Sequence, residues 1–233
     1  MKLYVADIEI ELIRKNIKNM HLYVLRPDGK IRVTAPFRLS EEKIISFISS
    51  RIDWIKEQQE KLNAEPHVKP ITYSSGDKLI IFGNTYILDV IESQKNSFIF
   101  FDGKAELYCK SNATKEQRQA IVEKALRAAL YEKVKPLLEK WESITQLKAS
   151  SFQIKKMKTR WGTCNTRTKK IWLNFELVTK QTECIEYVIM HELAHLSVPN
   201  HGKDFIYIMQ KYMPSWQALR DALNDNSNNN LSN

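Results

Sequence analysis

The chain is organised around the stretch His191-Glu192-Leu193-Ala194-His195, with His201 six residues further on, because these polar residues can act together only if the fold brings them close to one another. Residues four apart lie on the same face of a helix, so His191 and His195 can present two imidazole nitrogens to one metal ion. His201 follows a turn and can supply a third nitrogen, which leaves one position of a zinc ion open for water. Water bound to zinc becomes acidic, and Glu192 lies beside the ligands to take its proton.

The small number of histidines limits the chance that this pattern is accidental. The chain has five histidines, and three of them fall within residues 191–201. The plainer alternative is a buried helix whose histidines only form hydrogen bonds in the core. The context favours a metal site, because an apolar stripe would pack this helix on a core and leave the histidines on another side. The stripe consists of Ile185, Ile189, Leu193 and Leu196.

Length and composition are those of an ordinary globular protein. With 233 residues, of which 43% are hydrophobic and 27% charged, the chain can form one large domain or two small ones. Four charged residues among the first twelve argue against a signal peptide, and no run of eighteen apolar residues indicates a membrane span. The three cysteines lack a C-x-x-C spacing and are expected to be reduced thiols. We therefore expect a cytoplasmic protein that does not enter a membrane.

A basic stretch precedes the histidines. The net charge is +9, and no acidic residue occurs between Ser143 and Phe175. The stretch, residues 148–170, predicts a surface beside the active site for an anion, whether nucleic acid, nucleotide or acidic polypeptide. A solvated basic strand surface without a partner is the other interpretation. Its cations are Lys148, Lys155, Lys156, Lys158, Arg160, Arg167, Lys169 and Lys170.

Residues 1–112 are predicted to form a β-rich N-terminal region with one amphipathic helix. The helix is expected from Glu41 to about Leu62, after the N-cap Ser40, and a linker follows over residues 63–75. No internal repeat is evident. The alternation of apolar residues and the turn residues between them predict strands over 4–12, 21–25 and 31–35 and hairpins over 79–91 and 97–109.

Residues 113–224 are predicted to form a separate α+β domain that carries the histidines. It begins with a long helix over 115–141, which Pro136 is expected to bend or interrupt. A strand over 170–177 precedes the metal helix, and a free edge of this strand could hold an extended peptide, with Asn174 as a substrate contact. Further helices are expected over 202–213 and from Trp216 onward. The tail 225–233, rich in Asn and Ser, is expected to be disordered.

Several motifs in the last third of the chain carry a family resemblance. They are Arg160-Trp161-Gly162-Thr163-Cys164, the strand end Leu173-Asn174, the segments from Tyr187 to Leu196 and from Asn200 to Phe205, and Pro214. Together they resemble the YgjP-like metallopeptidases, which are relatives of the SprT-like proteases among the minimal gluzincin-type zincins. The resemblance implies a zincin-like catalytic domain over 113–224 and a zinc ion held by His191, His195 and His201. It also implies that Glu192 is the general base and that Arg160 and Trp161 line the cleft.

The expected function is that of a zinc-dependent metallopeptidase, an endopeptidase that hydrolyses polypeptides with Glu192 as the general base. Arg160 or Tyr212 could stabilise the oxyanion, and Trp161 and Asn174 are further candidate substrate contacts. One alternative is a metal-dependent nucleotide (pyro)phosphohydrolase with the same site. Another is a nucleic-acid-associated SprT-like protease, and both would use the basic stretch. Three histidines suit zinc, while nickel, cobalt and manganese stay open, and nothing in the sequence indicates an oligomeric state.

Overall fold

The structure is a computed structural model that describes residues 1–25, 28–64 and 71–224. The chain divides into two compact units, residues 1–68 (unit 1) and 69–233 (unit 2), each described by itself below. This division differs from the expected boundary between residues 112 and 113. The reason is packing, because the strands within 78–109 share one hydrophobic core with the long helix and the histidine helix. The expected disorder of the tail 225–233, and part of the expected linker 63–75, lie outside the described residues.

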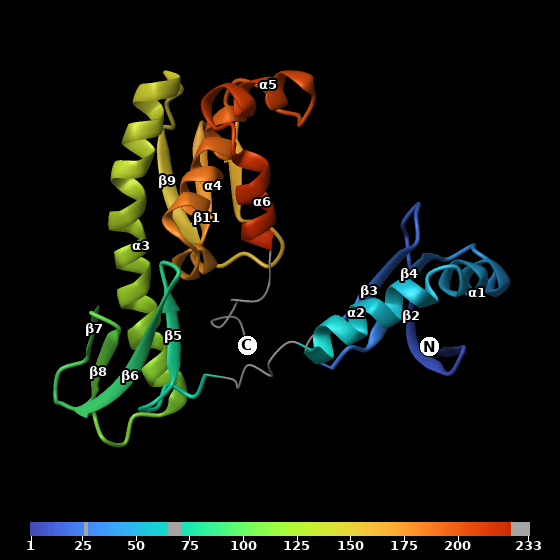
Figure 1. Ribbon diagram of the computed structural model, residues 1–233, viewed down its shortest axis with the longest axis horizontal. Coiled ribbons are helices and arrows are strands. Elements are labelled where there is room, and N and C mark those ends of the chain that lie inside the picture. Colours follow the sequence, from blue (N-terminus) through green and yellow to red (C-terminus); the bar gives the residue numbers. More distant parts are fainter. Residues whose placement is uncertain (26–27, 65–70, 225–233) are drawn as a thin grey trace. The chain divides into compact units, whose positions relative to one another are not determined.

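Unit 1 consists of a four-stranded sheet with two helices (Figure 1). The strand order is β1-β2-β4-β3, in which the central pair is parallel and both outer pairs are antiparallel. The core is built from alternate residues of the strands and from the apolar face of the helices, including Ile10, Val33, Ile44 and Ile48. The elements are β1 (Lys2–Val5), β2 (Ile8–Lys15), β3 (His21–Val24), β4 (Ile31–Pro36), α1 (Glu41–Ser49) and α2 (Ile52–Ala64).

Two features of unit 1 differ from the sequence prediction because of local backbone geometry. The strand expected over 4–12 is a hairpin, since Ala6 and Asp7, with φ of 48° and 64°, reverse the chain. The single helix expected from residue 41 is interrupted after Ser49, where the N–H of Arg51 bonds to the carbonyl of Ile48 at 2.9 Å. The apolar spacing continues across both places, so periodicity alone does not reveal either break.

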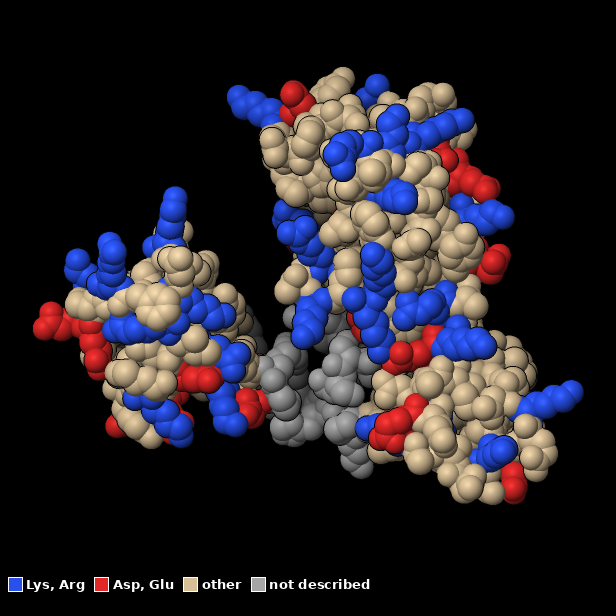
Figure 2. Space-filling view, turned by 180° about the vertical axis from the view of Figure 1, so that it is seen from behind, with Lys and Arg blue, Asp and Glu red and all other residues tan. Residues whose placement is uncertain are grey.

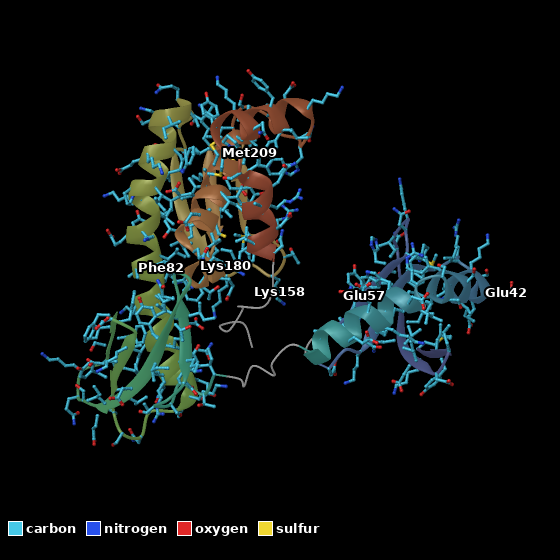
Figure 3. All side chains as sticks on the ribbon, viewed as in Figure 1. Glu42, Glu57, Phe82, Lys158, Lys180 and Met209 are labelled. Carbon is cyan, nitrogen blue, oxygen red and sulfur yellow. The ribbon has the colours of Figure 1, made fainter. Side chains whose placement is uncertain are left out.

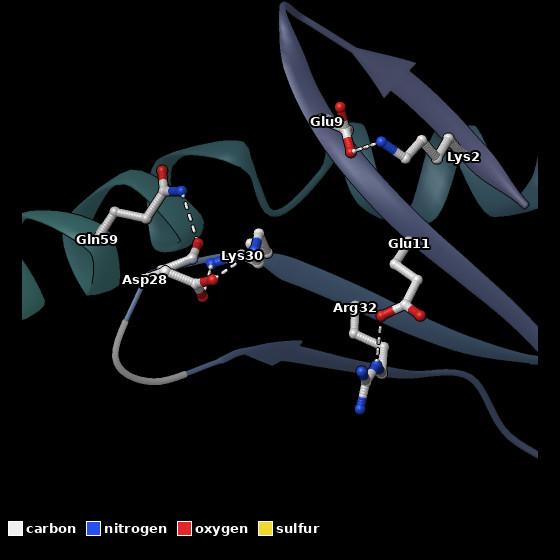
Figure 4. Close-up of polar contacts among 8 residues, drawn as sticks. Lys2, Glu9, Glu11, Asp28, Lys30, Arg32 and Gln59 are labelled. Carbon is white, nitrogen blue, oxygen red and sulfur yellow. Dashed lines mark hydrogen bonds and ion pairs between the residues drawn. The ribbon is translucent and has the colours of Figure 1, made fainter.

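Polar contacts connect neighbouring elements of unit 1 (Figure 4). Glu11 on β2 accepts from Arg32 on the parallel strand β4 at 2.7 Å, and both side chains are partly exposed. The side-chain amide of Gln59 on α2 donates to the carbonyl of Gly29 at 2.9 Å. This bond joins the second helix to the turn between β3 and β4.

Unit 2 opens with a sheet that repeats the arrangement of unit 1. Its strand order is β5-β6-β8-β7, again with a parallel central pair and antiparallel outer pairs. The turn between the first two strands again has two residues with positive φ, Phe82 at 50° and Gly83 at 82°. The sequence analysis found no repeat, because the similarity lies in strand order and turns rather than in matching side chains. The strands are β5 (Lys78–Ile81), β6 (Asn84–Glu92), β7 (Ser97–Phe101) and β8 (Lys104–Cys109).

The long helix α3 (Lys115–Thr145) connects this sheet to the histidine helix. It begins at a capping box in which Thr114 and Gln117 satisfy each other's backbone N–H groups. Its buried face includes Leu126, Leu130 and Val134. Pro136 does not interrupt the helix; it lies on the exposed side, where water can satisfy the carbonyl that proline leaves unbonded.

The rest of unit 2 is a three-stranded sheet with three helices, and α4 lies between α3 and α6 (Figure 1). The strand order is β10-β11-β9. The predicted α+β class is confirmed. None of the described helices is both long and apolar enough to cross a membrane. The elements are β9 (Ser151–Lys155), β10 (Gly162–Asn165), β11 (Lys170–Asn174), a 3-10 helix η1 (Phe175–Thr179), α4 (Thr182–Ala194), α5 (Lys203–Tyr212) and α6 (Trp216–Asn224).

Candidate metal centre

The end of helix α4 presents two histidines toward a third one from the segment before α5. His191 lies in the last turn of α4, His195 is its C-cap, and His201 comes two residues before α5. One ring nitrogen from each histidine lies within 4.8 Å of the other two. The ring centroids form a triangle with sides of 4.9, 4.9 and 4.7 Å. The structure therefore brings together the three histidines that the motif singled out.

Neighbouring oxygen atoms orient two of the rings. Nδ1 of His195 lies 3.2 Å from the carbonyl oxygen of Val198, and Nδ1 of His191 lies 3.5 Å from the hydroxyl of Tyr187. A proton on each Nδ1 leaves the Nε2 lone pair for a metal ion. Nε2 of His191 faces Nε2 of His201 at 3.0 Å. Two nitrogens bound at about 2.0–2.1 Å to one tetrahedral zinc ion lie about 3.4 Å apart, so this donor set fits zinc.

Partial burial of the His191 and His195 rings favours their neutral forms. Burial, together with the neighbouring His195 and His201, lowers the pKa of His191 to about 3. Burial also lowers the pKa of His195, against the effect of its bond to the Val198 carbonyl. The ring of Phe205, 2% exposed, lies with its centroid 4.7–4.9 Å from all three imidazoles. Neutral imidazole is the form that binds a metal.

Glu192 is packed against the backbone of Gly162 at the start of β10. The residue is 4% exposed, and a Cβ atom at position 162 would lie only 2.5 Å from its Oε1 and 2.8 Å from its Cγ. Only glycine leaves room for the carboxylate here. Burial raises the pKa of Glu192 to about 8, while the guanidinium of Arg160 opposes this shift. A carboxyl group with such a pKa can both take and return a proton near neutral pH.

The histidines and Glu192 border a cavity of about 510 Å³. Arg160 and Trp161 line it, as the sequence analysis expected, whereas Asn174 and Tyr212 are not among its lining residues. Tyr187, Gly162 and Arg220 also line the cavity, although they were not predicted from the sequence as members of this site. A glycine inside a strand next to a motif is a signal of close backbone approach and could have revealed Gly162. No such signal marks the residues of α6.

Asn174 holds the loop that precedes β10. Its side-chain amide donates to the carbonyls of Met157 and Arg160, both at 2.9 Å, and its Oδ1 accepts from the N–H groups of Met157 and Glu176, both at 3.2 Å. The residue is 5% exposed. Its polar atoms are occupied within the protein, so we assign it the positioning of Arg160 rather than contact with a substrate.

The strand with a free edge at the cavity is β10 rather than β11. β11 is central, since it pairs with β10 on one side and with β9 on the other. The expectation that residues 170–177 offer an edge to a peptide is therefore wrong. In addition, this strand ends at Asn174, whose Oδ1 caps the 3-10 turn that follows. Gly162, Thr163 and Cys164 of β10 line the cavity.

The cations of the basic stretch do not gather at the cavity. Arg160 is the one cation of the stretch among the described lining residues. Lys156 forms an ion pair with Glu123 at 2.6 Å, and Lys155 lies 4.6 Å above the ring of Trp172. On the face of unit 2 shown in Figure 2, Lys and Arg side chains are scattered, with Asp and Glu among them. The geometry therefore gives no support to a nucleotide or nucleic-acid partner at this stretch.

Comparison with known protein families places the chain among metal-dependent peptidases. The family described as "YgjP-like, metallopeptidase domain" matches residues 18–226. The chain therefore belongs to the YgjP-like metallopeptidase family, as the motifs indicated. Membership implies a catalytic metal, and the cluster of three histidines can bind one. Comparison with curated proteins finds no match.

Two solved structures are similar to part of this chain. One is the metallopeptidase zymogen of Pyrococcus abyssi abylysin, at 24% identity over 38% of this chain and 89% of that chain, with a TM-score of 0.36. The other is the metallopeptidase zymogen of Methanocaldococcus jannaschii jannalysin, at 25% identity over 37% of this chain and 89% of that chain, with a TM-score of 0.34.

Proposed function

We propose that the protein is a zinc-dependent metalloendopeptidase in which His191, His195 and His201 hold the metal and Glu192 is the general base. The observation that carries the proposal is the meeting of the three imidazoles and a buried carboxylate in one cavity. A bound zinc ion would supply a polarised substrate carbonyl and a water molecule of lowered pKa. The Nδ1 atoms of His191 and His195 lie next to oxygen atoms of the protein, and these contacts support metal ligation through Nε2.

Glu192 would carry the proton during peptide hydrolysis. Its carboxylate takes a proton from the attacking water, and the resulting carboxylic acid passes it to the leaving amine. The raised pKa favours the protonated form needed in the second step, and Arg160 keeps the charged form accessible for the first. Gly162 fixes the carboxylate through close packing.

An extended substrate would lie along the free edge of β10. Main-chain hydrogen bonds to an edge strand bind peptides with little dependence on their side chains. Gly162 to Cys164 line the cavity, so a peptide added to this edge would pass the histidines. Of the two residues considered for stabilising the oxyanion, Arg160 lines the same cavity. Tyr212 does not line it.

The test compares wild type with Glu192→Gln and with the matched control Glu183→Gln. Both glutamates lie on α4, but Glu183 is exposed in the first turn. Metal content is measured on the purified proteins, and hydrolysis of a denatured protein is followed by the appearance of new amino termini. We expect about one zinc ion in each protein and a loss of roughly 10²–10⁴-fold in activity for Glu192→Gln alone.

The nucleotide alternative is checked in the same assay with a panel of nucleoside triphosphates. Release of phosphate or pyrophosphate without peptide cleavage would move the protein to the phosphohydrolase class. Wild-type protein without a bound metal, or a fully active Glu192→Gln variant, would overturn the proposed function.

A further inference from the structure

The cavity at the metal centre carries an excess of positive charge. Its described lining residues include two cations, Arg160 and Arg220, and Glu192 as the one acidic residue. The proposed function assigns Glu192 to proton transfer, and a zinc ion would add two further positive charges. A cavity of this kind attracts an anionic group of the substrate.

The two arginines reach the cavity from different elements that are joined to each other. Arg160 lies in the loop before β10, which also carries Lys158 (Figure 3), and Arg220 lies on α6. The indole N–H of Trp161 donates to Oδ1 of Asn224 at the end of α6, at 3.1 Å. This bond connects the loop to the helix at the rim of the cavity.

The loop is held firmly while its arginine side chain stays available. Asn174 donates to the carbonyl of Arg160 from its side chain, at 2.9 Å, and to the carbonyl of Trp161 from its backbone, at 2.8 Å. Among the described residues, the guanidinium of Arg160 has no hydrogen-bond or ion-pair partner. A fixed backbone with free donors is the arrangement expected of a residue that binds a ligand.

Arg220 is also largely available. Its partner is the neighbouring Asp221, at 3.3 Å, whose side chain is 70% exposed, so their ion pair is weak. The guanidinium carbon lies 5.4 Å from the ring centroid of Trp216, which supports the side chain from α6.

The ligand that suits these groups is a carboxylate. The planar fork of a guanidinium matches the two oxygens of a carboxylate, and two such forks can share one. In a peptidase the carboxylate can come from an Asp or Glu side chain beside the scissile bond, or from the free C-terminus of the substrate. Resting on the proposed function, we propose that Arg160 and Arg220 form a carboxylate-binding subsite, so that the enzyme prefers peptides with such a group next to the bond it cleaves.

The experiment compares matched peptides. Cleavage sites of the wild type in a denatured protein are mapped by mass spectrometry, and a peptide that spans one site is made with Glu or Gln beside the scissile bond. Each form is made with a free and with an amidated C-terminus. We expect kcat/KM to favour Glu over Gln by roughly 10–100-fold, as for a hydrogen bond between charged groups. A preference for the free over the amidated terminus would assign the subsite to the α-carboxylate instead.

Arg220→Gln is the informative variant, and Arg167→Gln is its control, since Arg167 is an exposed cation in the turn between β10 and β11 that does not line the cavity. Arg220→Gln should abolish the preference for Glu, mainly by raising the KM of the Glu peptide. Arg167→Gln should change neither the preference for Glu nor the KM of the Glu peptide. A preference for Glu that persists in Arg220→Gln would contradict the subsite. Circular dichroism and metal content verify that the variants fold.

Binding to the Glu192→Gln variant separates this inference from the proposed function, because it requires no turnover. Arg220-dependent selection of the Glu peptide in fluorescence anisotropy, with a wild type that cleaves no peptide, would uphold the subsite and refute the peptidase. Equal binding and equal cleavage of the Glu and Gln peptides would refute the carboxylate subsite and uphold the peptidase. Tighter, Arg220-dependent binding of inorganic phosphate or a nucleoside triphosphate would assign the arginines to phosphate and overturn the carboxylate subsite.

Discussion

The sheet of unit 1 and the first sheet of unit 2 have the same strand order and the same pairing directions, but only the second supports the metal centre. Both begin with a hairpin whose turn residues have positive φ. In unit 1 this turn, Ala6-Asp7, is exposed. In unit 2 the N–H of Phe82 donates to the carbonyl of Val178 at 2.7 Å, and Gly83 packs on Gln181, the N-cap of α4.

The helices that follow the two sheets differ in length and in the elements that they contact. Unit 1 has two helices of 9 and 13 residues, which complete its own core. In unit 2 the first sheet is followed by α3, a helix of 31 residues, which packs on β7 and β8 and extends further to α4. Phe82 and Lys180 are labelled in Figure 3 where the strands approach the helices. One strand arrangement therefore serves either as a module with its own core or as a support for the helix that carries the histidines, depending on its turn and the length of its helix.

The largest expected effect on stability comes from substitutions that create a cavity in the core of each unit. Leu130→Ala in α3 and Ile48→Ala in α1 remove fully buried side chains, and each should lower the free energy of unfolding by about 2–5 kcal/mol. We expect Leu130→Ala to weaken unit 2 and reduce metal retention, and Ile48→Ala to weaken unit 1 alone. Hydrogen exchange measured on peptides of each unit by mass spectrometry can follow the unfolding of the two units in urea separately. A single transition that shifts equally in both variants would contradict independent units.

A smaller effect is expected at the corresponding turns. Gly83→Ala places a Cβ at φ 82°, 2.5 Å from Cγ and 3.3 Å from Cα of Gln181, and should destabilise unit 2 by about 1–3 kcal/mol and reduce peptidase activity. The matched change Asp7→Gly relieves a left-handed residue but raises the entropy of the unfolded chain, so a change below about 1 kcal/mol is expected. Thermal unfolding of both variants measures the difference. Similar losses at the two turns would show that docking on α4 has no special role.

Thiol labelling provides a third comparison, because all three cysteines lie in unit 2. Burial, with a contribution from Glu192, raises the pKa of Cys164 to about 11. At about pH 8 the folded protein therefore has less thiolate than the unfolded one, and alkylation of Cys164 should be roughly tenfold slower. The rate should increase as pH rises toward 11. Mass spectrometry measures it, and acceleration by Ile48→Ala would contradict the separation of the units.

The smallest effect is expected at the polar contacts between each helix and its neighbours. Glu186 on α4 accepts from Lys140 at 2.9 Å and from the indole of Trp141 at 3.2 Å, both on α3. Glu186→Gln should cost less than about 1 kcal/mol, because the lysine is half exposed and the amide can still accept. Gln59→Ala should cost about 1 kcal/mol in unit 1. Urea unfolding of each variant gives the values, and a loss above about 3 kcal/mol in either would show that these contacts dominate.

The family, the α+β class and the meeting of the three histidines could be predicted because they depend on short motifs. The spacing of His191 and His195 defines one helix face, and His201 follows after a turn. The boundary between units could not be predicted, since it depends on which strands share a core with α3. The hairpin at Ala6 and the end of α1 depend on backbone angles that apolar spacing does not encode.

Residues of the cavity that could not be predicted from the sequence were missed for a related reason. Arg220 lies on a helix without a motif, and only the tertiary packing of α6 brings it to the histidines. Asn174 was expected to contact a substrate because it lies on a strand whose free edge could hold a peptide at the rim of the cleft. Its four hydrogen bonds within the protein could not be inferred from sequence, because they depend on the path of the loop from Met157 to Arg160.

The contact between Glu192 and Gly162 has a consequence for protein design. A histidine triad copied onto a helix of another scaffold would reproduce the metal ligands but not the position of the carboxylate. The helix must also lie so close to a strand that a hydrogen atom is the largest side chain the strand can carry there. A graft of this site should therefore transfer β10 together with α4 and preserve their spacing, since the backbone of the strand is part of the functional template.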